Sequence, residues 1–120
     1  MNIAYLSTEY PPLVYGGLGV YVDSISREIA SMGHKVSVFT MGRPDLKRKE
    51  TKKGVTAFRE IPLPLGDALE IFYSEETLSW GTGLDFLNSL LSYNQLAAAR
   101  LRDSGPFDLC VAHDWLALPA

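Results

Sequence analysis

The first forty residues contain a strand, a helix and a second strand at a spacing that few folds accommodate. Residues 2–7 hold the apolar run Ile3 to Leu6 between polar residues, which is typical of a strand buried on both faces. Residues 35–40 (KVSVFT) alternate and carry β-branched side chains, which predicts a second strand. Such a βαβ unit has parallel strands and a right-handed crossover. We therefore expect an α/β fold built on a parallel sheet.

The helix between these strands is predicted from the spacing of its apolar residues. They recur at steps of four, three, four and three, which places them on one face of a helix. Gly33 follows where a left-handed cap is needed, because glycine lacks the Cβ that would clash there. We expect the helix to end near Met32. The stripe consists of Leu18, Val22, Ile25, Ile29 and Met32.

The rest of the chain is predicted to add two strands and one helix. Residues 42–53 are interpreted as a polar loop, and the basic run at 47–53, which Glu50 interrupts, as a solvated part of it. Residues 54–61 read as a third strand ended by Pro62 and Pro64, whereas residues 66–83 receive no assignment.

A second helix is expected after residue 83, closed by Ser104, Gly105 and Pro106. Residues 107–113 (FDLCVAH) predict a fourth, apolar strand. The stripe that should pack this helix on the core consists of Leu84, Leu87, Leu91, Ala98 and Leu101.

Composition excludes several classes of protein. An apolar fraction of 47% in 120 residues suits one small globular domain. A net charge of −3 with scattered charges gives no positive field for nucleic acid. Cys110 is the only cysteine, and no apolar run is long enough for a signal peptide or a membrane span. We expect a cytoplasmic protein with no nucleic-acid partner, no membrane span, no cofactor and no metal.

The sequence ends directly after the fourth predicted strand. A doubly wound sheet normally continues with further βα units, and a fourth strand without them is left with an unpaired edge. We therefore expect a Rossmann-like doubly wound parallel sheet that is truncated, with residues 1–120 forming part of a domain in a longer protein.

Gly16, Gly17 and Gly19 lie between the first strand and the first helix. Parallel sheets bind ligands beyond the carboxyl ends of their strands, and backbone N–H groups at a helix N-terminus attract anions. The alternative is that these glycines only make a tight turn. A dinucleotide site is disfavoured, because only two glycines fit G-x-G-x-x-G and a lead-in of about nine residues with two prolines precedes them.

His113, Asp114 and Trp115 follow the fourth strand, at the same edge of the predicted sheet. A neutral imidazole there can donate one hydrogen bond and accept another. Structural roles are also open: Asp114 could cap the next helix and Trp115 could cover the core. His34 follows the Gly33 cap at the opposite end of the sheet and is interpreted as structural.

Together these segments resemble the N-terminal domain of retaining glycosyltransferases with two Rossmann-like domains (the GT-B architecture), particularly the glycogen and starch synthases and related sugar transferases. The resemblance covers essentially the whole chain. Those synthases typically read K-x-G-G-L-G-D, whereas Val14 and Val20 stand at the lysine and aspartate positions here. The motifs are E-Y-P-P (9–12), G-G-L-G (16–19), G-H-K-V-x-V-F-T (33–40) and H-D-W (113–115).

The resemblance implies a nucleotide-sugar donor of the ADP- or UDP-glucose class, held mainly by a C-terminal domain that is absent here. It implies a glycan acceptor, such as an α-glucan, on the N-terminal domain. The donor diphosphate would face the backbone of Gly16, Gly17, Leu18 and Gly19. His113 would be catalytic beside the donor sugar, with Asp114 and Trp115 as support.

No protein nucleophile is assigned. Glu9 could be mistaken for half of a hydrolase carboxylate pair, but its neighbouring prolines favour a structural turn. The 120-residue chain alone is expected to transfer no sugar. The alternative function is a non-catalytic carbohydrate- or nucleotide-binding module of flavodoxin-like form.

Overall fold

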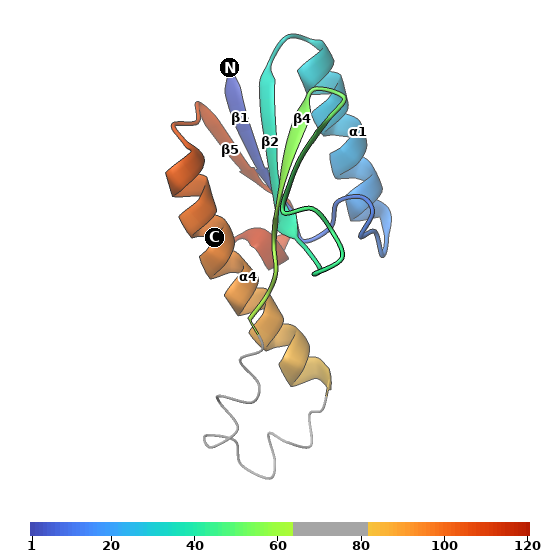
Figure 1. Ribbon diagram of the computed structural model, residues 1–120, viewed down its shortest axis with the longest axis vertical. Helices are drawn as coiled ribbons and strands as arrows, with labels where there is room; N and C mark the ends of the chain where they lie inside the picture. The colour runs from blue at the N-terminus through green and yellow to red at the C-terminus, as the bar shows by residue number, and fades with distance from the viewer. Residues whose placement is uncertain (64–81) are drawn as a thin grey trace.

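The structure is a computed structural model that describes residues 1–63 and 82–120 (Figure 1). Most of the unassigned stretch 66–83 lies outside the described residues. A five-stranded sheet of order β3-β4-β2-β1-β5 forms the centre. Four strands are parallel and β3 is antiparallel to β4, so the expected α/β fold on a mainly parallel sheet is confirmed. The strands are β1 (Asn2–Leu6), β2 (Lys35–Met41), β3 (Lys49–Lys52), β4 (Val55–Glu60) and β5 (Leu109–Ala112).

In the described residues, helices α1 (Gly17–Ser31) and α4 (Thr82–Ser104) cover opposite faces of the sheet (Figure 1). Alternate residues of β1 belong to the two cores: Ile3 and Tyr5 pack with α1, whereas Ala4 and Leu6 lie in the cluster of α4. The first strand is thus buried on both faces, as its continuous apolar run predicts. Within the described ranges, neither helix is both long and apolar enough to cross a membrane.

The chain reverses its direction of travel across the sheet between β1 and β5. The connection through α1 carries the chain from β1 to β2, and the connection through α4 brings it from β4 back past β1 to β5. Leu6 and Ala112 pair at the carboxyl ends of β1 and β5. The glycine turn follows one strand and His113 follows the other. Both motifs therefore lie at the topological switch point, where open α/β sheets bind ligands.

The boundaries of α1 agree with the apolar period. The helix ends at Ser31 with Met32 as its C-cap. Gly33 then adopts φ +93°, the left-handed conformation for which glycine is favoured. Lys35 begins β2 directly afterwards, paired with Asn2. The predicted βαβ unit is confirmed.

The predicted stripe of the second helix is wrong at Leu87 and Leu91, whereas Leu101 packs against the core as expected. Leu91 is 50% exposed, and the side chains that face the sheet are those of Leu90, Tyr93 and Ala97. The Tyr93 hydroxyl approaches the carbonyl oxygens of Ser7 at 3.1 Å and Phe39 at 2.8 Å, at the carboxyl ends of β1 and β2. Burial raises the pKa of this phenol, which stays a neutral donor. A polar anchor therefore sets the rotation of α4, and leucine spacing alone does not reveal it.

Residues 42–53 are not wholly a loop, because β3 occupies part of this range. β3 pairs antiparallel with β4 at the sheet edge, and the hydroxyls of Thr51 and Thr56 lie 3.0 Å apart across the pair. The hairpin turn consists of Lys53 and Gly54, with φ +51° and +79°. Positive φ at both central residues is the type I′ geometry, which matches strand twist. A polar, charged edge strand gives little apolar signal and was therefore missed.

The fourth strand is also less buried than its apolar sequence suggests. β5 lies at the outer edge of the sheet, where Leu109 is 46% exposed and Cys110 is exposed. The expectation that this strand has an unpaired edge within 1–120 is met in the described residues. Its inner edge pairs with β1.

Lys53→Asn should stabilise the protein. The left-handed conformation costs an ordinary L-residue about 1–2 kcal/mol, and asparagine tolerates it better in type I′ turns. We expect the free energy of unfolding in urea to rise by about 0.5–1 kcal/mol. Lys52→Asn removes the same charge from a strand position and is the matched control, for which no gain is expected. Equal stability of the wild type and Lys53→Asn would contradict the backbone strain assigned to Lys53.

Candidate functional site

The carboxylate of Glu9 holds the glycine turn in place. Its Oε2 accepts hydrogen bonds from the backbone N–H groups of Tyr15 at 3.1 Å, Gly16 at 3.1 Å and Gly19 at 3.3 Å. Gly16 is the N-cap of α1 and has no side chain with which to cap it. Glu9 therefore supplies the cap from the preceding loop and places a negative charge at the positive end of the helix.

The proline-bearing segment between β1 and α1 is tied down at three points. Ser7 Oγ donates to the carbonyl of Glu9 at 2.8 Å. Tyr10 and Leu13 exchange backbone hydrogen bonds of 3.1 and 3.0 Å. Arg59 of β4 donates from Nη2 to the carbonyl of Pro11 at 2.9 Å. The long lead-in is thus a folded loop that presents Glu9 to the turn.

The three glycines of the turn have different roles. A Cβ on Gly19 would lie 2.9 Å from Val14 Cγ2 and 3.2 Å from Glu9 Cβ, so packing within the chain requires glycine there. A Cβ on Gly16 or Gly17 would meet nothing within 4 Å. Gly16 is in an extended conformation, with φ −162°, that any residue can adopt. Packing within the chain explains why glycine is needed at Gly19 but not at Gly16 or Gly17. These two glycines leave an open surface beside the backbone.

Two N–H groups of the turn have no acceptor. In the described part of the chain, the N–H groups of Gly16 and Gly19 are bonded to Glu9, but those of Gly17 and Leu18 have no partner. The first N–H groups of a helix have no acceptor within it. Of the four residues expected to face an anion, Gly17 and Leu18 thus offer the free donors.

His113 lies between two aromatic rings at the end of β5. Its imidazole stacks on Tyr5 of β1, with centroids 5.1 Å apart and planes at 16°, and meets the ring of Tyr21 edge-on at 5.5 Å. Its backbone N–H donates to the carbonyl of Leu6 at 2.8 Å. Nε2 is buried and has no hydrogen-bond partner among the described residues. Burial lowers the pKa of His113, which favours the neutral imidazole.

The aromatic contact of His113 connects it to the glycine turn. Tyr21 lies four residues after Gly17, so the two share a face of α1 near its N-terminus. His113 therefore stands beside the helix end that carries the free N–H groups. His34 lies at the amino ends of β1 and β2, opposite to the site, where its Nδ1 is 3.0 Å from the N-terminal amino group. It is not part of this site.

Of the structural roles suggested for Asp114 and Trp115, the structure supports only the one for Asp114. Asp114 Oδ1 accepts from the backbone N–H of Trp115 at 2.6 Å and caps the short helix η2 (Trp115–Ala117), as one alternative predicted. Trp115 is 66% exposed, so the expectation that the indole covers the core is wrong. Ala117 is the residue of η2 that packs in the core.

Sequence reasoning missed two residues that organise the site. Glu9 was assigned to a turn but not to the helix cap, although an acidic residue ahead of a glycine-rich helix start is a signal for it. Asn94 of α4 donates to the carbonyl of Leu116 at 2.9 Å and accepts from the N–H of Ala120 at 2.9 Å. It fixes the segment after His113 against α4, and no local pattern marks this long-range role.

The fold and the site define a Rossmann-like α/β domain with free backbone donors and a neutral histidine at its switch point. Residues 2–120 match the family described as "Starch synthase catalytic domain", and the chain belongs to this family. The resemblance to the N-terminal domain of GT-B glycosyltransferases is thereby confirmed. The family match favours a glycosyltransferase over a non-catalytic module.

Two curated relatives agree with this family. The chain is 30% identical over 120 residues to a protein named glycogen synthase in Mycobacterium tuberculosis, covering 97% of this chain and 28% of that protein. It is 36% identical over 63 residues to an uncharacterized glycosyltransferase of Methanocaldococcus jannaschii, covering 52% of this chain and 16% of the relative. A solved sucrose-phosphate synthase from Thermosynechococcus elongatus has a TM-score of 0.49 and 20% identity, covering 94% of this chain and 33% of that structure. The chain thus spans less than a third of the length of the curated relatives it matches.

Stability should depend on pH through His113. Because burial lowers the folded-state pKa below the ordinary value near 6.5, the unfolded chain binds more protons between these two values. The stabilising contribution is complete above about pH 6.5 and is lost as the pH falls through the folded-state pKa. Urea unfolding from about pH 7.5 to about pH 5.5 should therefore show a smaller acid-induced loss of stability in His113→Gln than in the wild type. Identical losses would contradict the desolvated environment of the imidazole.

Proposed function

We propose that this chain is the acceptor-side, N-terminal domain of a retaining glycosyltransferase that moves a glucosyl or similar unit from a nucleotide sugar to a glycan. An ADP- or UDP-linked glucose donor and an α-glucan acceptor are the finer form of the proposal. The family and relatives named glycogen synthase support this finer form. A C-terminal domain that holds most of the donor, and a location in the cytoplasm, belong to the same proposal.

The free N–H groups of Gly17 and Leu18 carry the proposal. They are at the positive end of α1, beside glycines that leave room for a ligand on the backbone. Departure of a nucleoside diphosphate builds negative charge on its phosphate oxygens. Donors that are already oriented stabilise such charge without reorganising at the moment of reaction. This arrangement supports a diphosphate at the turn.

His113 is the proposed catalytic residue beside the donor sugar. Its neutral imidazole can donate to or accept from a sugar hydroxyl, and Nε2 lacks any partner within the described residues. The stacking on Tyr5 fixes the plane of the ring. An imidazole held in this way positions the sugar while positive charge develops at its anomeric carbon. The proposal assigns no protein nucleophile.

The charge around the turn supports a contribution from a second domain. Glu9 already places one negative charge at the helix end, and Val14 stands where the synthases carry a lysine. A diphosphate at the free N–H groups therefore needs cationic partners from elsewhere. A C-terminal domain that closes over this edge is the proposed source.

Gly17→Ala should separate catalysis from folding. The added Cβ enters space that the fold leaves open, so the free energy of unfolding should stay level or rise by up to about 1 kcal/mol in the helix. The same Cβ would occupy the surface proposed for the donor. In the full-length enzyme we expect kcat/KM for the nucleotide sugar to fall at least about tenfold, equivalent to about 1.4 kcal/mol.

Two further substitutions control this experiment. Gly19→Ala should lower the free energy of unfolding by about 1–3 kcal/mol, because its Cβ would overlap Val14 and Glu9. Gly83→Ala adds a methyl group to the first turn of α4, also in open space, and should leave turnover unchanged. Wild-type turnover in Gly17→Ala would show that the glycines serve only the turn, and the proposal would fail.

A further inference from the structure

A groove that contains neither His113 nor the glycine turn lies on the α1 face of the sheet. It has a volume of about 440 Å³, with the β3–β4 hairpin as its floor and α1 as one wall. The loop between β2 and β3 forms the other wall, and Tyr10, Pro11 and Pro12 close one end. The volume is within the range of small-molecule sites.

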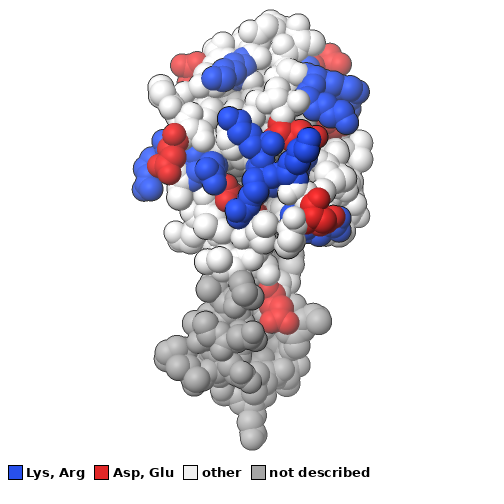
Figure 2. Space-filling view, in the orientation of Figure 1, with Lys and Arg blue, Asp and Glu red and all other residues white. Residues whose placement is uncertain are grey.

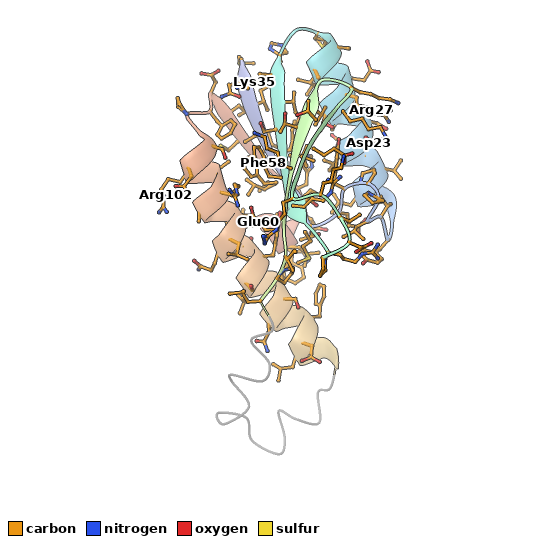
Figure 3. All side chains as sticks on the ribbon, viewed as in Figure 1. Asp23, Arg27, Lys35, Phe58, Glu60 and Arg102 are labelled. Carbon is orange, nitrogen blue, oxygen red and sulfur yellow. The ribbon has the colours of Figure 1, made fainter. Side chains whose placement is uncertain are left out.

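The charges that line the groove do not balance. Each acidic residue already has an arginine partner: Asp23 with Arg27 on α1 at 2.5 Å (Figure 3), Asp45 with Arg43 at 3.1 Å, and Glu50 with Arg59 at 3.1 Å. Lys47, Lys52 and Lys53 also line it, and none has a carboxylate partner in the described residues. The groove therefore carries uncompensated positive charge on a chain whose net charge is −3.

The surface view agrees with this distribution. Figure 2 shows Lys and Arg side chains gathered over the middle of the molecule, with acidic side chains among them, where Figure 1 places β4 and its neighbouring hairpin. The segment 47–53, interpreted from sequence as solvated, contributes Lys47, Lys52 and Lys53 to the lining of the groove. Its charges converge on a hollow because β3 folds back on β4.

Arg59 gives independent evidence for a missing acceptor. Its side chain is almost completely buried, and Nη1 and Nη2 donate to Lys47, Glu50 and Pro11. Nε, however, is buried and has no hydrogen-bond partner in the described part of the chain. A buried N–H without an acceptor is costly and rare in proteins. Arg59 also lines the groove, so an oxyanion bound there would lie beside this guanidinium.

We propose that the groove binds a small phosphate ester, with the phosphate against the lysines and a ring against Pro11 and Pro12. Three ammonium groups suit a phosphate, which lysine binds as a point charge. Pro11 and Pro12, at one end of the groove, give an apolar surface that a sugar or nucleoside ring can cover, whereas Val55 and Ala57 of the floor are buried. A sugar phosphate and a nucleoside monophosphate share this chemistry.

The groove borders the loop that carries Glu9. Pro11, which lines it, accepts the hydrogen bond from Arg59 and follows Glu9 by two residues. A bound ligand would therefore contact the segment that positions the glycine turn. Binding here does not depend on the proposed transferase activity, because none of the site residues of that activity lines the groove.

The test is calorimetric titration of the full-length protein with glucose 6-phosphate, AMP and inorganic phosphate. We expect at least one ester to bind with a Kd below about 1 mM, and inorganic phosphate to bind more weakly because it lacks a ring. In the double variant Lys52→Gln, Lys53→Asn the affinity should fall at least about tenfold. Lys53→Asn also relieves the positive φ of the turn, so loss of folding will not explain loss of binding.

Lys49→Gln is the matched control, because it removes the same charge from β3 but on the opposite face, where Nζ lies 5.4 Å from the Phe58 ring centroid. This variant and Gly17→Ala should bind the ester like the wild type. No binding by either ester, or equal losses in the double variant and Lys49→Gln, would overturn the proposal. Loss of binding in Gly17→Ala would instead assign the ligand to the glycine turn and would also overturn it. Equal affinity for inorganic phosphate would refute the contact between a ring and the prolines.

Discussion

The carboxylate of Glu9 at the start of α1 is the interaction on which the site depends. One oxygen accepts three backbone N–H groups and so fixes the path of the chain from the proline loop into the helix. A carboxylate in such a position stabilises a helix by about 0.3–1 kcal/mol at an exposed site. Its larger consequence is geometric. Because Gly16 and Gly19 are bonded internally, the remaining donors of Gly17 and Leu18 have fixed directions before any ligand arrives.

The core supports this edge of the sheet from the other side. Tyr93 joins α4 to the carbonyls of Ser7 and Phe39, directly where β1 and β2 end. Asn94, the next residue, holds the segment that follows His113. A single turn of α4 thus anchors both sides of the switch point. Scaffolds of this kind hold binding groups in place with residues that never touch the ligand.

The elements that could be predicted from sequence are those determined by residues close to one another in the chain. The apolar run of β1, the stripe of α1 from Leu18 to Ile29 and the left-handed Gly33 each depend on neighbours within a few residues, and the structure confirms them. Met32, the last predicted member of the stripe, is instead 73% exposed. The positions of His113 and the glycine turn followed from topology, since both come after parallel strands. Their roles toward a ligand remain predictions.

What could not be predicted depends on contacts between distant segments. The rotation of α4 follows from a tyrosine hydroxyl that reaches the ends of two strands, and β3 follows from a turn that brings a charged segment back alongside β4. The cap from Glu9 reaches Gly19, ten residues further along the chain, and Ala117 fills the core where Trp115 is exposed. Spacing within one element carries no information about such interactions.

The central claim is that Glu9 and the diphosphate of a donor share one helix end, with separate N–H groups for each. A crystal structure of the full-length protein with a bound nucleoside diphosphate tests this most directly. We predict phosphate oxygens within hydrogen-bond distance of the N–H groups of Gly17 and Leu18, while Glu9 remains bonded to the N–H of Gly19. A diphosphate bound away from the turn, or one that displaces Glu9 from the helix end, would contradict this claim.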